Sequence, residues 1–182
     1  MESGKFILLE DKNQTLEYLE KIKEFEEFMP ITFNFECERS LAKNNINFKI
    51  GDEYETPALC KNLQKQAIKL TEEICSKIDI SYRDINLLQL FYSDLTFFFI
   101  SSIKYLRILR KIKTKEKIKE ILIFKNIKFN VANEICSKIA TEIFKGNSKT
   151  IEYASSTEKN PLFMKFAEYL QNFIAEIKLK LN

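Results

Sequence analysis

Residues 118–144 read IKEILIFKNIKFNVANEICSKIATEIF. Within this stretch, residues 120–124 predict a short strand without polar alternation, residues 125–128 a polar turn, and the residues that follow an amphipathic helix. A strand without alternation must be covered on both of its faces, which is typical of parallel sheets in α/β proteins. The stretch therefore predicts an α/β fold.

Four more strands, and the helices between them, are predicted in the rest of the chain. The strands are expected at residues 5–9, 31–35, 46–50 and 150–154. Helices are expected at residues 14–28 with Asn13 as N-cap, at 36–44, at about 56–78 with Thr56 as N-cap, at 82–115 and at 161–181. Strands joined by helical crossovers run parallel, and the right-handed crossover rule favours a doubly wound, Rossmann-like sheet with the order 3-2-1-4-5. We therefore expect one domain over residues 1–182, with a helical insertion at about residues 56–117 between the third and fourth strands.

The composition of the chain argues against several kinds of site. There is no His to act as a base or a zinc ligand, so proton transfer would fall to Asp, Glu, Lys or Tyr, and no metal site is expected. Only 3 glycines are present, and they form no glycine-rich phosphate loop, so no cofactor is expected. The 4 cysteines form no C-x-x-C pair and the N-terminus has no signal-peptide pattern, which predicts reduced thiols in a cytoplasmic protein.

Polar residues follow the first and fourth predicted strands, between which the strand order reverses. Ligands of doubly wound sheets bind at this switch point, beyond the carboxyl ends of the strands. The candidate ligand-binding residues there are Asn13, Asn126 and Asn130, with Ser155 and Ser156 after the fifth strand. Glu10 and Asp11 are the candidates for a catalytic base. The same residues also fit ordinary turns and helix caps, which need no ligand.

A second candidate surface lies in the helical insertion. Residues 104–119 carry eight Lys or Arg against one Glu, and the apolar segment TFFFI at residues 96–100 precedes them. An aromatic patch beside a basic one suits an anionic membrane surface or a protein partner, through Phe97, Phe98, Phe99, Lys104, Arg107, Arg110 and Lys111. The alternative is an aromatic core with a solvated basic face. Gln89 and Asp94 argue against a transmembrane span, and a net charge of only +3 argues against nucleic acid as a partner.

Three segments together resemble a known family. They are LLEDKNQTLEYLEKIKEF at residues 8–25, ITFNFECERSLAKNNINFKIGDEYETP at 31–57 and KIKEILIFKN at 117–126. With the two helices between the second and third segments, they resemble the N-terminal half of polysaccharide-biosynthesis glycosyltransferases that have two Rossmann domains (the GT-B type). The resemblance covers nearly the whole chain. It lies in the order of the predicted elements and in short sequence segments, and it includes no catalytic motif.

The resemblance implies transfer of a sugar from an activated donor to a surface glycan or a lipid-linked acceptor. It implies that this chain is the acceptor-side half, and that a second domain or protein binds the donor. A place in the cytoplasm, peripheral at the inner membrane face, would suit that role. The alternative hypothesis is a non-enzymatic α/β module that docks a protein partner or an anionic membrane through its helical insertion.

Overall fold

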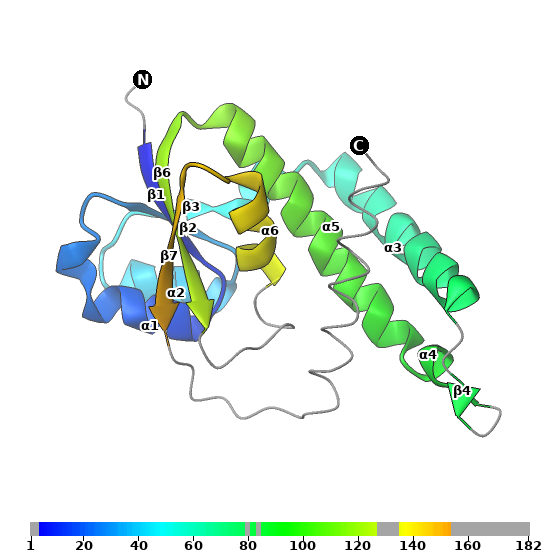
Figure 1. Cartoon of the computed structure of the whole chain (residues 1–182). Coiled ribbons are helices and arrows are strands. Elements are labelled where there is room, and N and C mark those ends of the chain that lie inside the picture. Colours follow the sequence, from blue (N-terminus) through cyan, green and yellow to red (C-terminus); the bar gives the residue numbers. More distant parts are fainter. Residues whose placement is uncertain (1–3, 79–80, 83–84, 127–134, 154–182) are drawn as a thin grey trace.

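A five-stranded parallel sheet forms the centre of the molecule (Figure 1). The computed structural model describes residues 4–78, 81–82, 85–126 and 135–153. The sheet has the order β3-β2-β1-β6-β7, and its strands are β1 (Gly4–Leu9), β2 (Met29–Thr32), β3 (Lys49–Ile50), β6 (Ile118–Asn126) and β7 (Ser148–Tyr153). This arrangement confirms the predicted α/β fold and the predicted strand order 3-2-1-4-5.

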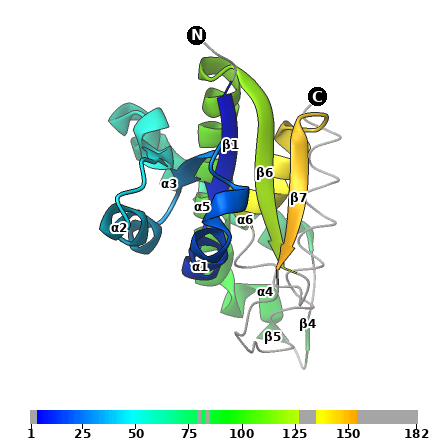
Figure 2. The same cartoon turned by 90° about the vertical axis from the view of Figure 1, so that its left-hand side faces the viewer.

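Helices cover both faces of this sheet (Figures 1 and 2). α1 (Lys12–Glu20) and α2 (Phe35–Lys43) lie on one face, and α5 (Tyr92–Lys115) and α6 (Ile135–Ile143) lie on the other. The side chains of β1 alternate between the two layers, since Phe6 and Leu8 pack with α5 and α6 while Ile7 and Leu9 pack with α1 and α2. The central strand is therefore apolar on both faces, as its unbroken run of apolar residues predicts.

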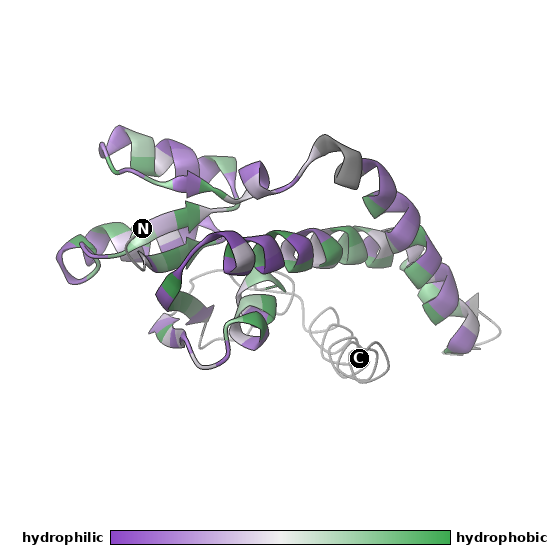
Figure 3. Ribbon diagram, turned by 90° about the horizontal axis from the view of Figure 1, so that it is seen from above, coloured by the Kyte–Doolittle hydropathy of each residue, from purple (hydrophilic) through white to green (hydrophobic). Residues whose placement is uncertain are grey.

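The predicted helical insertion lies between β3 and β6. It contains η2 (Gly51–Tyr54), α3 (Pro57–Lys77), the short strands β4 (Ser81–Tyr82) and β5 (Ile85–Asn86), α4 (Leu87–Leu90) and α5. The second half of α5 packs on the sheet, whereas its first half packs on α3 around a separate cluster of Ala67, Ile74, Leu88, Leu95 and Phe99. α3 and the first half of α5 thus extend away from the sheet as an arm (Figure 3). Among the described residues, no helix is both long and apolar enough to cross a membrane.

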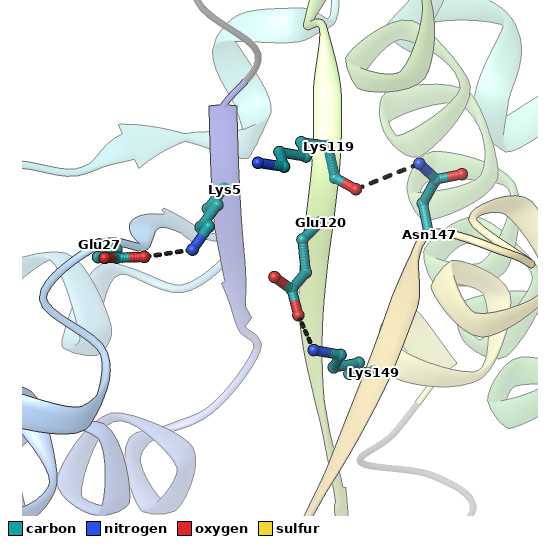
Figure 4. Close-up of polar contacts among 6 residues, drawn as sticks. All are labelled: Lys5, Glu27, Lys119, Glu120, Asn147 and Lys149. Carbon is teal, nitrogen blue, oxygen red and sulfur yellow. Dashed lines mark hydrogen bonds and ion pairs between the residues drawn. The ribbon is translucent and has the colours of Figure 1, made fainter.

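Polar contacts tie the strands together at the amino end of the sheet (Figure 4). Lys5 on β1 pairs with Glu27, and Lys149 Nζ on β7 lies 2.6 Å from Glu120 Oε1 on β6. Asn147 Nδ2 also donates to the carbonyl oxygen of Lys119, at 3.3 Å. These contacts lie at the opposite end of the sheet from the predicted switch point.

The first predicted helix, at residues 14–28, differs from the structure at both ends. α1 begins at Lys12, because the Asp11 carboxylate caps it by accepting from the backbone N–H of Gln14 at 2.9 Å. The predicted cap, Asn13, lies inside the helix instead. α1 ends at Glu20, and a 3-10 turn, η1 (Ile22–Glu24), follows. The chain leaves the helix there, and Phe25 packs against the Phe124 ring of β6, with 6.3 Å between the ring centroids.

The other predicted boundaries shift by smaller amounts. β2 lies at Met29–Thr32 instead of 31–35, because Asn34 already caps α2 by accepting from the Glu36 N–H at 2.8 Å. β3 is limited to two residues, and the region predicted as helix from residue 82 begins with the hairpin of β4 and β5. Thr56 makes no side-chain cap, although α3 does begin at Pro57. The helix predicted at residues 161–181 lies outside the described residues.

Candidate functional site

Glu10 lies at the carboxyl end of the central strand β1, at the switch point between β1 and β6. Its backbone N–H donates to Oε1 of the fully buried Gln14, at 2.7 Å, and the Asp11 cap then turns the chain into α1. This tight turn keeps Glu10 against the neighbouring helix α6. Glu10 is consequently only 9% exposed, which is unusual for a carboxyl group.

The first turn of α6 surrounds the Glu10 carboxylate with hydrogen-bond donors. The backbone N–H of Cys136 donates to Oε1 at 3.0 Å, and the backbone N–H of Ser137 donates to Oε2 at 3.2 Å. The Ser137 hydroxyl donates to Oε2 as well, also at 3.2 Å. The first N–H groups of a helix have no partners within the helix, and the helix dipole favours a negative charge beside them. Glu10 therefore caps α6 from another part of the chain.

Burial dominates the protonation of this carboxyl group. Loss of water raises the pKa of Glu10 to about 8, although the hydrogen bonds from Cys136 and Ser137 lower it in part. The nearby charge of Asp11 adds a smaller upward contribution to the pKa. The group therefore changes its charge near neutral pH, which ordinary surface carboxyl groups do not.

Tyr105 of α5 lies close enough to Glu10 for the charge of that carboxylate to affect the pKa of Tyr105. Burial raises the pKa of Tyr105 well above its usual value, and the Glu10 charge raises it further, so this phenol stays protonated. The Tyr105 ring meets the Phe33 ring edge to face, with 5.5 Å between the centroids. Gly51 makes room for Phe33, because a Cβ atom at Gly51 would lie 2.5 Å from that ring.

Cys37 and Cys136, two buried free thiols near this site, are suited to packing and not to nucleophilic chemistry. The free thiol of Cys75 lies in the arm, where it is half-buried on α3. Burial raises the pKa of Cys136 far above its usual value, and the Glu10 charge raises it further. Burial also raises the pKa of Cys37 to about 11. A nucleophilic cysteine needs a thiolate at neutral pH, so these buried thiols do not supply one.

Asp11, the other candidate base, is already engaged in structural contacts. Its Oδ1 atom caps α1, and its Oδ2 atom accepts from the hydroxyl of Tyr153 at the end of β7, at 3.4 Å. Asp11 thus links the first and last described strands at their carboxyl ends. Asn13 lies half-buried in the first turn of α1. Of the two predicted carboxylates, Glu10 is therefore the one that is set in a distinctive environment.

The remaining predicted site residues are described only in part. Asn126 is the last residue of β6 and its backbone pairs with Tyr153, while its side chain lies outside the described part of the structure. Asn130, Ser155 and Ser156 lie outside the described residues altogether. Ser137, Tyr105 and Gln14 were not predicted from the sequence, because an isolated Ser, Tyr or Gln in a helical pattern does not indicate which strand end it meets.

The aromatic and basic residues of the insertion divide between the core and the surface. Phe99 is 3% exposed and packs between α3 and α5, so it does not belong to the surface predicted for it. Phe98 is half-buried against Phe99, and Phe97 is 68% exposed. Successive residues of a helix point about 100° apart, so three adjacent phenylalanines cannot share one face.

The basic residues of the predicted surface divide in a similar way. Lys104 Nζ lies 2.7 Å from Asp52 Oδ2, and Arg107 donates to Gln66 Oε1 at 2.7 Å. Arg107 also lies 3.8 Å from the carboxylate of Glu55. Lys111 is half-buried, whereas Arg110 is exposed. The Lys104 and Arg107 side chains therefore serve first to fasten α5 to η2 and α3.

Within the described part of the chain, no group of His, Cys, Asp or Glu side chains is arranged to hold a metal ion. The chemistry that the residues at the switch point can supply is hydrogen bonding and proton transfer, through Glu10 and the donors of α6. No family model, curated protein or solved structure matches the chain.

Proposed function

We propose that this chain is the acceptor-side domain of a sugar-transfer system, with Glu10 as the group that takes the proton from the acceptor hydroxyl. The acceptor is a surface glycan or a lipid-linked glycan, and a second domain or protein binds the sugar donor. The resemblance of three sequence segments to glycosyltransferases of the two-Rossmann-domain type motivates this proposal. The parallel sheet with a helical insertion between β3 and β6 agrees with it.

The environment of Glu10 is the single observation that carries the proposal. A carboxylate offers about four acceptor positions on its two oxygens, and three donors from α6 use three of them. No donor among the described residues fills the fourth position, which a hydroxyl group of a ligand would occupy. A base with a pKa near the working pH gives the best compromise between being deprotonated and being able to take a proton, and burial raises the pKa of Glu10 to about 8.

The proposal is tested by NMR titration of the isotope-labelled chain with a short-chain prenyl diphosphate sugar as the acceptor analogue. We expect shift changes at the amides of Glu10, Ser137 and Tyr105, and we expect the interaction to strengthen as the pH rises through about 8. Glu10→Gln keeps the shape of the side chain but cannot take a proton, so it should lose this pH dependence. Glu20→Gln, at an exposed position of α1, is the matched control. Shift changes confined to the arm, or none at all, would count against the proposal.

A second candidate function is docking of a protein through the tip of the arm. Leu90, Phe91 and Phe97 are 66%, 39% and 68% exposed there. The exposed Arg110 lies thirteen residues further along α5, which is about 20 Å along the axis and about 140° around it from Phe97. Arg110 thus lies on another face than Phe97, whereas Lys115, which is also exposed, lies eighteen residues from Phe97 and therefore on the same face of α5. The exposed apolar side chains at the tip are the observation that supports docking of a protein partner.

Photo-crosslinking in the host cell would test the docking function. A photoreactive phenylalanine at position 97 is compared with the same residue at position 35, because Phe35 is 74% exposed and lies far from the arm on α2. A discrete protein adduct from position 97 alone supports docking at the arm. Adducts with phospholipid, or equal products from both positions, would contradict it.

A further inference from the structure

Ser137 contributes two of the three hydrogen bonds that Glu10 accepts from α6. Its backbone N–H and its hydroxyl both lie 3.2 Å from Oε2 of Glu10, and Ser137 itself is only 6% exposed. The backbone bond would exist with any residue at this position other than proline, whereas the hydroxyl bond depends on this side chain. The residue thus gives the helix a specific contact with the end of β1.

We propose that Ser137 is a positioning residue for Glu10, and that its hydroxyl makes the first turn of α6 a proton-sensitive latch on β1. A role for Ser137 in catalysis rests on the proposed function, since a base must be held in place to receive a proton. The contact between Ser137 and Glu10 lies within this chain and does not depend on that function. The latch joins two segments that are 127 residues apart in the sequence.

The latch responds to protons because its three donors favour a charged acceptor. Deprotonated Glu10 accepts from all three, and such charge-assisted bonds are roughly twice as strong as neutral ones. Protonation adds a hydrogen at an acceptor position that these three donors do not use, and it turns the three charge-assisted bonds into weaker neutral ones. Proton uptake therefore weakens the hydrogen bonds between Glu10 and α6 without abolishing them. It also removes the larger cost of burying the charge, which is why the pKa of Glu10 is raised.

In the part of the chain that the structure describes, the titratable groups that face Glu10 come from the α1 cap, α5 and α6. Asp11 follows it in the chain, Tyr105 approaches from α5, and Cys136 lies beside it on α6. Both Tyr105 and Cys136 are neutral near pH 7, because burial raises the pKa of each. Asp11 disfavours the charge on Glu10, and the hydrogen bonds of Cys136 and Ser137 favour it. Ser137 supplies the favourable side-chain contribution among them.

The test is a pH titration of the full chain without any ligand, between pH 5 and 9.5, by NMR. The side-chain carboxyl carbon of Glu10 reports its ionisation, and the amides of Cys136 and Ser137 report the first turn of α6. In the wild-type protein we expect these three signals to titrate together, with one midpoint. Amides that do not follow the Glu10 carboxyl carbon would overturn the proposal, and this comparison needs no variant.

Variants separate the hydroxyl from the backbone contact. In Ser137→Ala, we expect the proton affinity of Glu10 to increase about threefold to tenfold, because a charge-assisted bond is lost. Ser137→Thr keeps the hydroxyl and should restore most of the wild-type midpoint. Ser102→Ala is the matched control, since the Ser102 hydroxyl donates to its own helix at the Phe98 carbonyl, at 2.8 Å. A Ser137→Ala midpoint equal to that of the wild type overturns the role of the hydroxyl.

This titration is independent of the proposed sugar transfer. It contains no acceptor, so a failure to bind acceptor analogues would not change its result. Conversely, if Ser137→Ala leaves the Glu10 midpoint unchanged while an acceptor still shifts the Glu10 signals, the positioning role fails and the proposed function stands.

Discussion

At the scale of single residues, Glu10 should make the stability of the protein depend on pH in an unusual direction. Burial raises the pKa of Glu10 from 4.5 to about 8, so between these values the folded state holds a proton that the unfolded state has lost. Its contribution to stability is therefore complete below about pH 4.5 and is lost as the pH rises to about 8. The free energy of unfolding, from urea titrations at pH 5, 6.5 and 8, should fall along this series.

Glu10→Gln removes the titrating group, so the free energy of unfolding should decrease less between pH 5 and pH 8 than it does in the wild type. The amide can accept only with its oxygen, so the variant should be less stable than the wild type at pH 5, and the difference should narrow towards pH 8. Glu20→Gln serves as the control and should follow the wild type. A gap between Glu10→Gln and wild type that is the same at all three pH values would show that Glu10 does not titrate in this range.

A second residue-scale prediction concerns Gly51, which supports the wall beside the site. An added Cβ atom would lie 2.5 Å from the Phe33 ring and 2.9 Å from the carbonyl oxygen of Thr32. Gly51→Ala should therefore reduce the free energy of unfolding by about 1–3 kcal/mol, the usual range for overpacking. In a Phe33→Ala background the ring is absent, and a smaller effect of Gly51→Ala in urea titration would identify the ring as the cause. An equal effect in both backgrounds would assign it to the Thr32 backbone.

At the scale of elements, α5 belongs to two cores, and Phe97 and Phe99 offer a matched pair to separate them. Phe99→Ala leaves a cavity between α3 and α5, where losses of about 3–5 kcal/mol are typical for a buried Phe. We expect faster amide hydrogen exchange in α3 and in the first half of α5, with β1 and β6 little changed. Phe97→Ala should alter stability by less than about 0.5 kcal/mol, because the side chain is 68% exposed. Faster exchange throughout the sheet in Phe99→Ala would show that arm and sheet unfold as one unit.

At the scale of the whole molecule, two carboxyl groups at opposite ends of the sheet should place the stability maximum in weakly acidic solution. Burial of Glu116 would raise its pKa, but its hydrogen bonds with Lys49 and Tyr54 outweigh this and hold the pKa below its usual value. Its contribution is present above about pH 4.5 and is lost as the pH falls below it. Glu10 acts in the opposite direction, so we expect the highest Tm near pH 5. A circular-dichroism series from pH 3 to 9 measures it, and a maximum at pH 8 or above would contradict this balance.

The strand order could be predicted from the sequence because strands joined by helices run parallel, and the right-handed crossover rule then leaves few possible orders. The end of α1 could not, since Leu16, Leu19, Ile22, Phe25 and Phe28 keep a helical step through a segment that leaves the helix after Glu20. Leu16 is 47% exposed and Phe25 is buried, which shows that contact with the sheet, and not the local pattern, decides where this helix stops.

Only the part of the candidate site that follows β1 could be predicted from the sequence. Glu10 follows a buried strand, so its position at the sheet edge could be inferred from the sequence. Its burial could not, because that depends on donors from a helix more than a hundred residues later. The Phe97 to Phe99 run shows the same limit, since helical geometry divides these rings between surface and core but the sequence alone does not say which ring faces inward.

The position of β1 at the centre of the sheet also has a consequence for how the chain folds as it is synthesised. β2, one neighbour of β1, follows after some twenty residues, but its other neighbour, β6, begins only at Ile118, and the α6 cap of Glu10 lies 126 residues away. Until those segments emerge from the ribosome, one edge of the central strand is unpaired. The Glu10 carboxylate at the end of this strand also lacks the hydrogen-bond donors of α6. Contacts of such long sequence separation slow folding. The first half of the nascent chain therefore carries an exposed strand edge that chaperones can recognise and that the arrival of β6 and α6 closes.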